Sequence, residues 1–179
     1  MVNGRDKWLN PSAALTRFNP PEGAVTAIQA AERKQRSRYG FLVSDIGLLI
    51  HQDTTSEVIE QIPVYPIPHM PSWLPGLINL RGNLIPVFDL KLFLGLEQHD
   101  EQQKQWLLIL GTDDQAVSLF CDGLPRIVDT THPLGRLPPL PTALRPHAVR
   151  AYAYEGIIWS EFDHEHFFKS ASAQIASTA

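Results

Sequence analysis

Four consecutive residues near the end of the chain, Asp163, His164, Glu165 and His166, carry side chains that commonly ligate transition metals. Asp163 is also well suited to cap a helix that begins at His164. On such a helix the two imidazoles point about 200° apart, so they do not converge on one ion. The pattern favours a helix start. A small metal-dependent enzyme that uses Asp163, His164 and His166 remains an alternative function.

The sequence lacks the other arrangements that commonly mark an enzyme. It contains no glycine-rich phosphate loop, no G-x-S-x-G, no H-E-x-x-H and no cysteine pair with zinc-site spacing. The single cysteine, Cys121, lies in an apolar run, where we expect a buried and unreactive thiol. We therefore expect no catalytic residue and no cofactor. The other histidines occur singly in predicted turns and loops: His51, His69, His99, His132 and His147.

Arg81 stands where the sequence predicts an exposed turn. Two apolar runs, Leu77–Leu80 and Leu84–Phe88, flank the segment Arg81-Gly82-Asn83 and are too short for helices, so we expect a buried β-hairpin. Gly82 supplies the positive φ angle that a tight turn needs. The turn leaves the guanidinium of Arg81 without a large neighbour, and we expect a partner to contact it.

Glu57 is the second charged residue of interest. Thr54 and Glu57 have the spacing of a capping box, which predicts one helical turn through about Gln61. Spacing alone does not say whether Glu57 meets Arg81. An exposed pair would contribute at most about 1 kcal/mol to stability. Its use would be to orient both side chains for a partner protein.

The charge of the chain is unevenly distributed. Residues 1–38 carry seven basic and three acidic residues, whereas residues 39–179 carry eight basic and sixteen acidic ones. A domain this acidic is a poor match for nucleic acid phosphates. No apolar run reaches the roughly 20 residues of a membrane helix, and the chain does not start like a secretory signal. One cysteine suits a reducing compartment. We expect a cytoplasmic protein that binds no nucleic acid and does not insert into membranes.

The composition divides the chain into three segments. Residues 1–38 form a basic extension in which two Asn-Pro pairs predict helix starts. Residues 39–168 contain short apolar strands separated by turn residues, which indicates a mainly β domain of barrel or sandwich type. After a last helix from His164 to about Lys169, residues 169–179 are predicted to be a flexible tail. The expected strands are Tyr39–Val43, Ile46–His51, Leu77–Leu80, Leu84–Phe88, Trp106–Leu110, Ala116–Cys121, Leu124–Val128, Ala148–Tyr154 and Ile157–Phe162.

Residues 39 to about 168 resemble the CheW family, the coupling proteins of bacterial chemosensory systems. The resemblance rests on Glu57-Val58-Ile59, on the stretch WLPGLINLRG at residues 73–82 and on IPVFDL at residues 85–90. In the family pattern a Glu precedes the Arg of N-L-R-G by 24 positions, as Glu57 precedes Arg81 here. The basic extension and the segment WSEFD at residues 159–163 are similar to the PilI subfamily, which serves type IV pilus twitching motility.

This resemblance implies a fold of two joined SH3-like β-barrels, each of about five strands, with short helices. It implies a non-enzymatic adaptor in a chemosensory array, which couples the cytoplasmic tips of methyl-accepting chemoreceptors to the regulatory domain of a CheA-type histidine kinase. Twitching motility is the expected output, with flagellar chemotaxis as the alternative. The partner-binding residues that the resemblance implies are Glu57, Asn79, Arg81, Gly82 and Val87.

Overall fold

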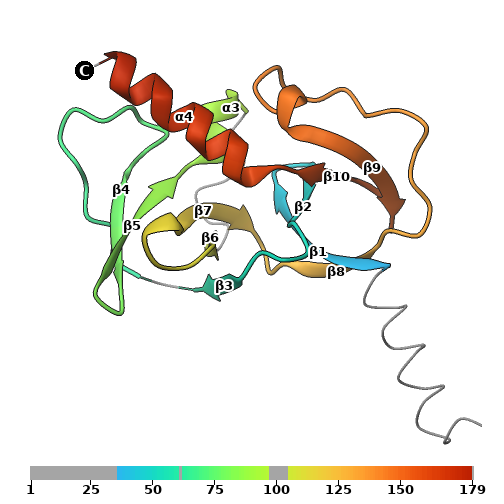
Figure 1. Cartoon of the computed structure of the whole chain (residues 1–179), viewed down its shortest axis with the longest axis horizontal. Coiled ribbons are helices and arrows are strands. Elements are labelled where there is room, and N and C mark those ends of the chain that lie inside the picture. Colours follow the sequence, from blue (N-terminus) through green and yellow to red (C-terminus); the bar gives the residue numbers. More distant parts are fainter. Residues whose placement is uncertain (1–35, 61, 97–104, 179) are drawn as a thin grey trace, which may run out of the picture. The chain divides into compact units, whose positions relative to one another are not determined.

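The computed structural model describes residues 36–60, 62–96 and 105–178, whose strands form two five-stranded sheets (Figure 1). The neighbouring strands of sheet A are, in order, β8 (Arg126–Asp129), β1 (Ser37–Val43), β2 (Ile46–Leu49), β10 (Ile157–Phe162) and β9 (Ala148–Tyr154). Those of sheet B are β3 (Ser56–Ile59), β6 (Gln105–Leu110), β7 (Val117–Asp122), β5 (Asn83–Phe88) and β4 (Gly76–Leu80).

The chain starts sheet A, builds all of sheet B, and then returns to sheet A. Strands β1 and β2 form a hairpin, strands β3 to β7 follow one another in sheet B, and β8 to β10 complete sheet A. Most neighbouring strands run antiparallel, whereas β2 with β10 and β5 with β7 are parallel pairs. The two sheets are therefore joined by two chain crossings, one between β2 and β3 and one between β7 and β8.

Each predicted strand corresponds to a strand of the structure. Strands β1 and β2 pair around Ser44 and Asp45, and β9 and β10 pair around Glu155 and Gly156. The proline-rich stretch before β4 contributes only an isolated bridge between Tyr65 and Leu77, because proline has no backbone N–H to donate to a longer ladder. The predicted helical turn at Glu57 is wrong, because this residue lies in β3, where it pairs with Ile109 of β6.

A short motif recurs after two strands, one in each sheet. Strand β5 ends in Phe88-Asp89 and is followed by helix α3 (Leu90–Leu94), while β10 ends in Phe162-Asp163 and is followed by helix α4 (His164–Thr178). Asp89 accepts a hydrogen bond from the Leu92 amide at 3.0 Å, and Asp163 accepts one from the His166 amide at 3.1 Å. The carboxylates thus cap equivalent helix starts.

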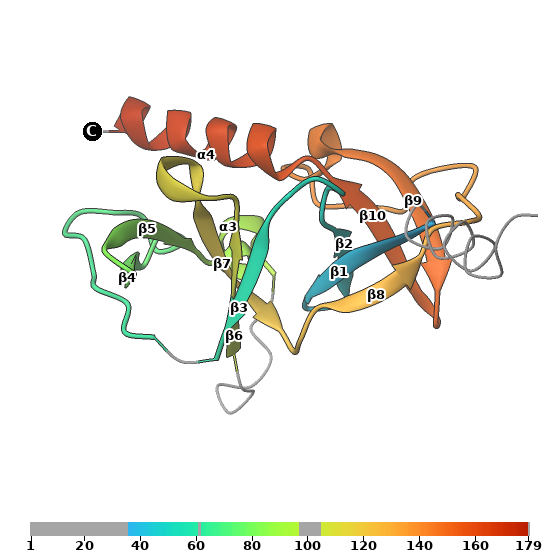
Figure 2. The same cartoon turned by 60° about the horizontal axis from the view of Figure 1, so that its bottom comes forward.

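Helix α4 packs on the apolar cluster that both sheets share. Figure 2 shows the helix running from β10 and lying above β5 and β7 in that view. Its residues Phe167, Phe168, Ala171 and Ile175 follow helical spacing and contact this cluster. The prediction of a tail after Lys169 is therefore wrong: the helix continues to Thr178, because the small residue Ala171 is buried and Ile175 extends the apolar face.

A partly buried ion pair also connects the two sheets. Lys91 of α3 donates to Asp122 at the end of β7 over 2.7 Å, and the other carboxylate oxygen of Asp122 accepts the Ser44 amide at 2.6 Å. Ser44 lies in the turn between β1 and β2 of sheet A. The side chains of Lys91 and Asp122 are only 12% and 16% exposed, so this carboxylate is held from both sides.

The described domain begins slightly earlier than predicted. Ser37 and Arg38 belong to β1, whose residues 37–40 pair with β8, so the boundary at residue 38 falls inside a strand. The helices predicted in the basic extension lie outside the described residues. Among those that are described, no helix has the length and apolar character needed to cross a bilayer.

Candidate partner-binding site

Arg81 lies at the tip of the β4–β5 hairpin, as the sequence predicted. Leu80 pairs with Asn83, so Arg81 and Gly82 are the two central residues of the turn. Their φ angles are 53° and 94°, the signature of a type I′ turn. A β-carbon on Gly82 would meet nothing within 4 Å, so the turn requires glycine there for its backbone conformation rather than for space.

The structure brings Arg81 and Glu57 together. The Arg81 Nη2 atom donates to the Glu57 Oε1 atom at 2.8 Å, and the two side chains are 74% and 38% exposed. Glu57 comes from β3 and Arg81 from the β4–β5 turn, so the pair spans opposite edge strands of sheet B. Both charged groups remain open to solvent and accessible to a partner.

The side chain of Asn79 stabilises this turn by a hydrogen bond to its backbone. Its side-chain Oδ1 atom accepts the Gly82 amide at 2.9 Å, which fixes the turn that carries Arg81. Asn79 is itself exposed. Asn79 and Gly82 therefore position the guanidinium through the backbone of the turn.

Val87 is not part of this surface. It is fully buried in β5, paired with Gly76 of β4 and Ser118 of β7, and packs in the cluster of sheet B. The prediction that Val87 contacts a partner is therefore corrected. The alternation of side chains along β5 turns Ile85 and Val87 to the core.

The same alternation exposes a residue that the sequence analysis missed. Leu84 is 65% exposed and lies opposite Asn79 in the hairpin. We predicted a buried run from Leu84 to Phe88, but a period of two that places Ile85 and Val87 inside would have placed Leu84 outside. Leu84 thus adds an apolar side chain beside the charged tip.

A turn with the opposite charges occupies the equivalent place on sheet A. Glu155 and Gly156, between β9 and β10, have φ angles of 50° and 77°, and Glu155 faces Arg126 of β8 at 3.8 Å. Arg126 also lies 5.9 Å from the ring centroid of buried Trp159. The acidic and basic residues have exchanged places relative to Glu57 and Arg81.

The predicted metal-ligand segment lies at the start of α4. His164 is buried, whereas His166 is exposed and its ring stands perpendicular to that of His147, with centroids 5.1 Å apart. Within the described ranges, no three His, Cys, Asp or Glu side chains are grouped so that they could hold a metal ion. The metal-dependent alternative therefore has no ligand set in this part of the chain.

Burial dominates the titration of the interior groups. It lowers the pKa of His147, assisted by His166 and opposed by Asp163. Burial also lowers the pKa of His164, against the carboxylates of Glu165 and Asp163. Burial together with Asp122 raises the pKa of Cys121 to about 12, which confirms the predicted buried thiol and makes a thiolate nucleophile unavailable near neutral pH.

The sequence of the described domain matches a known protein family. The CheW-like domain matches residues 37–157. The chain belongs to the CheW-like domain family. The resemblance predicted from the motifs around Glu57, Arg81 and residues 85–90 is thus confirmed.

Individual relatives of the CheW family agree with this assignment. A probable chemotaxis protein CheW from Rhizobium etli is 25% identical over 105 residues, which cover 59% of this chain and 68% of that protein. Protein PilI from Pseudomonas aeruginosa is 30% identical over 114 residues, which cover 62% of this chain and 63% of PilI. The chain thus spans about two thirds of the length of these relatives.

A solved CheW structure confirms the predicted fold. The scaffolding protein TtCheW from Thermoanaerobacter tengcongensis matches with a TM-score of 0.59 at 23% identity, over 75% of this chain and 92% of that one. At this level of identity the likeness concerns the fold. It supports the mainly β, CheW-like architecture with two five-stranded sheets.

Proposed function

We propose that this CheW-like chain is a non-enzymatic adaptor of a chemosensory array. In this role it binds the regulatory domain of a CheA-type histidine kinase and the cytoplasmic tip of a methyl-accepting chemoreceptor, in the cytoplasm and without inserting into the membrane itself. Family membership supports the class of function. The observation that carries the proposed kinase contact is the exposed Glu57–Arg81 pair.

Stability does not explain why arginine occupies the turn. A residue other than glycine in the left-handed conformation costs roughly 1–2 kcal/mol, and the φ of Arg81 places it there. An exposed ion pair contributes at most about 1 kcal/mol. Since the pair does not exceed the backbone cost, we assign Arg81 to recognition, with Glu57 orienting its guanidinium.

Twitching motility is the proposed output of the array. Its support is the 30% identity to PilI and the basic extension that precedes β1. The CheW relatives named for chemotaxis favour flagellar control as the second candidate. The two outputs differ in cells: a deletion strain should lose surface twitching and retain swimming in the first case, and show the reverse in the second.

The test is the charge reversal Arg81→Glu. Placing two carboxylates side by side removes the ion pair and presents the wrong charge, so binding to the kinase regulatory domain should fall at least tenfold by isothermal titration calorimetry. The thermal midpoint should shift little, because the side chain is exposed. In the deletion strain, the variant should fail to restore motility.

Two further variants control this experiment. Lys169→Glu also reverses a positive charge, at an exposed position of helix α4, and should leave kinase binding intact. The double exchange Glu57→Arg with Arg81→Glu restores an ion pair but reverses its direction, and it should still fail to bind. Kinase binding that survives in a folded Arg81→Glu protein would refute the role of Arg81.

A further inference from the structure

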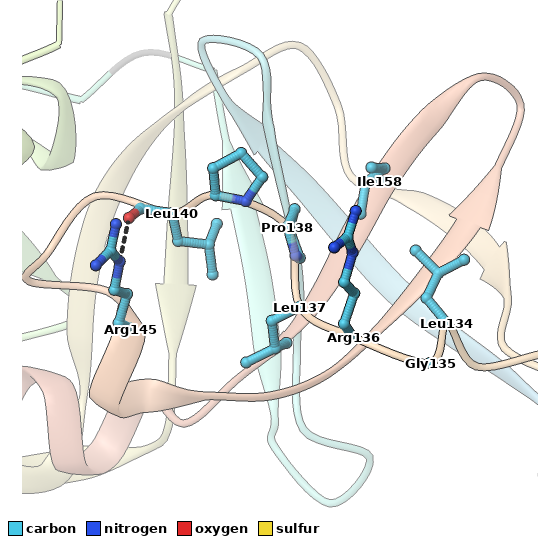
Figure 3. A pocket seen from close by; sticks show the side chains of 9 residues that line it. Leu134, Gly135, Arg136, Leu137, Pro138, Leu140, Arg145 and Ile158 are labelled. Atoms are coloured by element: carbon cyan, nitrogen blue, oxygen red, sulfur yellow. Dashed lines mark hydrogen bonds between the residues drawn. The ribbon is translucent and has the colours of Figure 1, made fainter.

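A second candidate surface lies on the loop between β8 and β9, away from the Glu57–Arg81 hairpin. Here the chain encloses a groove of about 950 Å³, seen in Figure 3. The walls are mostly apolar: Leu134 and Leu137 are each 37% exposed, and Ile158 of β10 is 43% exposed. Two prolines, Pro138 and Pro139, and buried Leu140 complete them.

This loop is held in place although it contains no long helix or strand. Its residue Leu134 donates its amide to Ala151 of β9 at 2.7 Å, and the Leu144 amide reaches Pro141 at 2.9 Å. Five prolines between residues 133 and 146 restrict the backbone further. A groove whose walls are fixed before binding costs less conformational entropy when it is filled.

The groove also carries positive charge. Arg136 and Arg145 line it, and Figure 3 shows the Arg145 Nε atom bonded to the Leu140 carbonyl. That contact, at 2.9 Å, uses only the Nε atom, so the two terminal nitrogens of Arg145 take no part in it. Among the described residues, neither Arg136 nor Arg145 forms an ion pair.

The surrounding sequence has the same bias. Residues 130–154 contain three arginines and no acidic residue, whereas the whole of residues 36–179 has ten basic and sixteen acidic ones. An isolated basic, leucine-lined stretch within an acidic domain is the arrangement that attracts an anion bearing apolar groups.

We propose that this groove binds an acidic segment of a partner protein, with aliphatic side chains seated on Leu134, Leu137 and Ile158 and carboxylates against Arg136 and Arg145. The chain's own residues 1–35 are a poor occupant, because they hold five basic and three acidic residues. The groove lies on sheet A's loop, so this contact is separate from the proposed kinase contact on sheet B.

The test uses a fluorescein-labelled synthetic peptide of sequence GLDDLLDG and fluorescence anisotropy with the full chain. Two matched peptides, GLNNLLNG and GSDDSSDG, remove the charge and the aliphatic groups in turn. We expect the first peptide to bind, and each matched peptide to bind more weakly. Nuclear magnetic resonance should place the peptide-induced shifts on the amides of residues 134–137, 140 and 158.

Arg136→Glu is the decisive variant, because its exposed side chain makes no described bond that the fold requires. It should weaken binding of GLDDLLDG about tenfold, since it removes an attraction and adds a repulsion. Arg81→Glu is the matched control and should bind the peptide normally, whatever its effect on the kinase. A failure of one proposal is thereby distinguishable from a failure of the other.

Several results would overturn the peptide proposal. Charge would have no role if the native chain and Arg136→Glu bound GLDDLLDG equally. The same would follow if the native chain bound GLNNLLNG as tightly as GLDDLLDG. Absence of peptide binding by the native chain would remove the groove as a peptide site. Sedimentation of the native chain with phosphatidylglycerol vesicles, without any peptide binding, would point to a lipid surface instead.

Discussion

At the scale of single residues, His164 has an unusual position for a titratable group. It is 6% exposed at the start of α4, where the equivalent residue after β5 is the buried Leu90. His51 opposes its protonation, and the carboxylates of Asp163 and Glu165 favour it without reversing the effect of burial. The folded state therefore holds a proton on His164 less tightly than the unfolded chain does.

We predict that His164→Leu flattens the dependence of stability on pH. The pKa of His164 is lowered on folding from its usual 6.5, so the unfolded state takes up the proton first as the pH falls below that value, and the folded state loses stability. Each unit of lowering corresponds to about 1.4 kcal/mol. Leucine removes this contribution. The stability of the variant should therefore rise relative to that of the native chain as the pH is lowered from 8 to 5.

Urea unfolding at the two pH values measures the difference. His147, whose pKa is also lowered, remains in the variant, so part of the pH dependence should persist. Parallel stability curves for the native chain and His164→Leu would show that His164 does not contribute to the acid sensitivity.

Strand β5 shows a property of single residues that the sequence did not predict, namely which face of the strand each side chain takes. An apolar run such as Leu84–Phe88 predicts a strand but not which face each residue takes. Pairing with β4 and β7 settles the faces, with Leu84 outside and Val87 inside. The position of Arg81 was predictable because a glycine-containing turn is recognisable from local sequence. Its contact with Glu57 was not, because that contact depends on how β3 pairs within the sheet.

At the scale of elements, local signals were reliable wherever the element forms its own contacts. The β4–β5 hairpin and the cap at Asp163 fall in this class. The capping-box signal at Glu57 was misleading, because pairing of β3 with β6 outweighs a weak preference for one helical turn. The end of α4 was predicted wrongly for a related reason. Ala171 and Ile175 extend the helix because they pack on the domain, which the composition of this segment does not reveal.

Ala171→Asp and Ala173→Asp test this account of α4. Both place the same residue in the same turn region of the helix, but Ala171 is 1% exposed and Ala173 is exposed. The first should lose about 3 kcal/mol or more, because it buries an unpaired carboxylate. The second should change stability by less than about 1 kcal/mol, a limit set by helix propensity.

Thermal or chemical unfolding of both variants gives the comparison. Circular dichroism before unfolding shows whether the helix has formed. Equal losses for the two variants would mean that Ala171 does not pack on the domain in solution.

At the scale of the whole molecule, the division of strands makes the two sheets depend on each other. Residues 36–96 supply two strands of sheet A and three of sheet B, and residues 105–178 supply the complementary sets. The central apolar cluster draws on both sheets and on α4. Neither half of the chain contains a complete sheet.

We predict that the two halves fold only together. Polypeptides 36–96 and 105–179 should each lack a cooperative melting transition when produced alone, because each exposes unpaired strand edges and half of the shared cluster. Produced together, they should co-purify in equal amounts and show the domain's near-ultraviolet circular dichroism. A single half that folds as a monomer would contradict this interdependence.

The same strand order bears on how the protein is made. A ribosome delivers β1 and β2 before sheet B, yet their neighbours in sheet A, β8 and β10, are made only after it. Sheet B, whose strands are contiguous, can close as soon as β7 has left the exit tunnel. Buried Leu49 of the β1–β2 hairpin packs with Val128, Tyr152 and Trp159, so it must wait for the strands that follow sheet B. The nascent chain therefore presents this apolar face to chaperones until β8 and β10 have been synthesised.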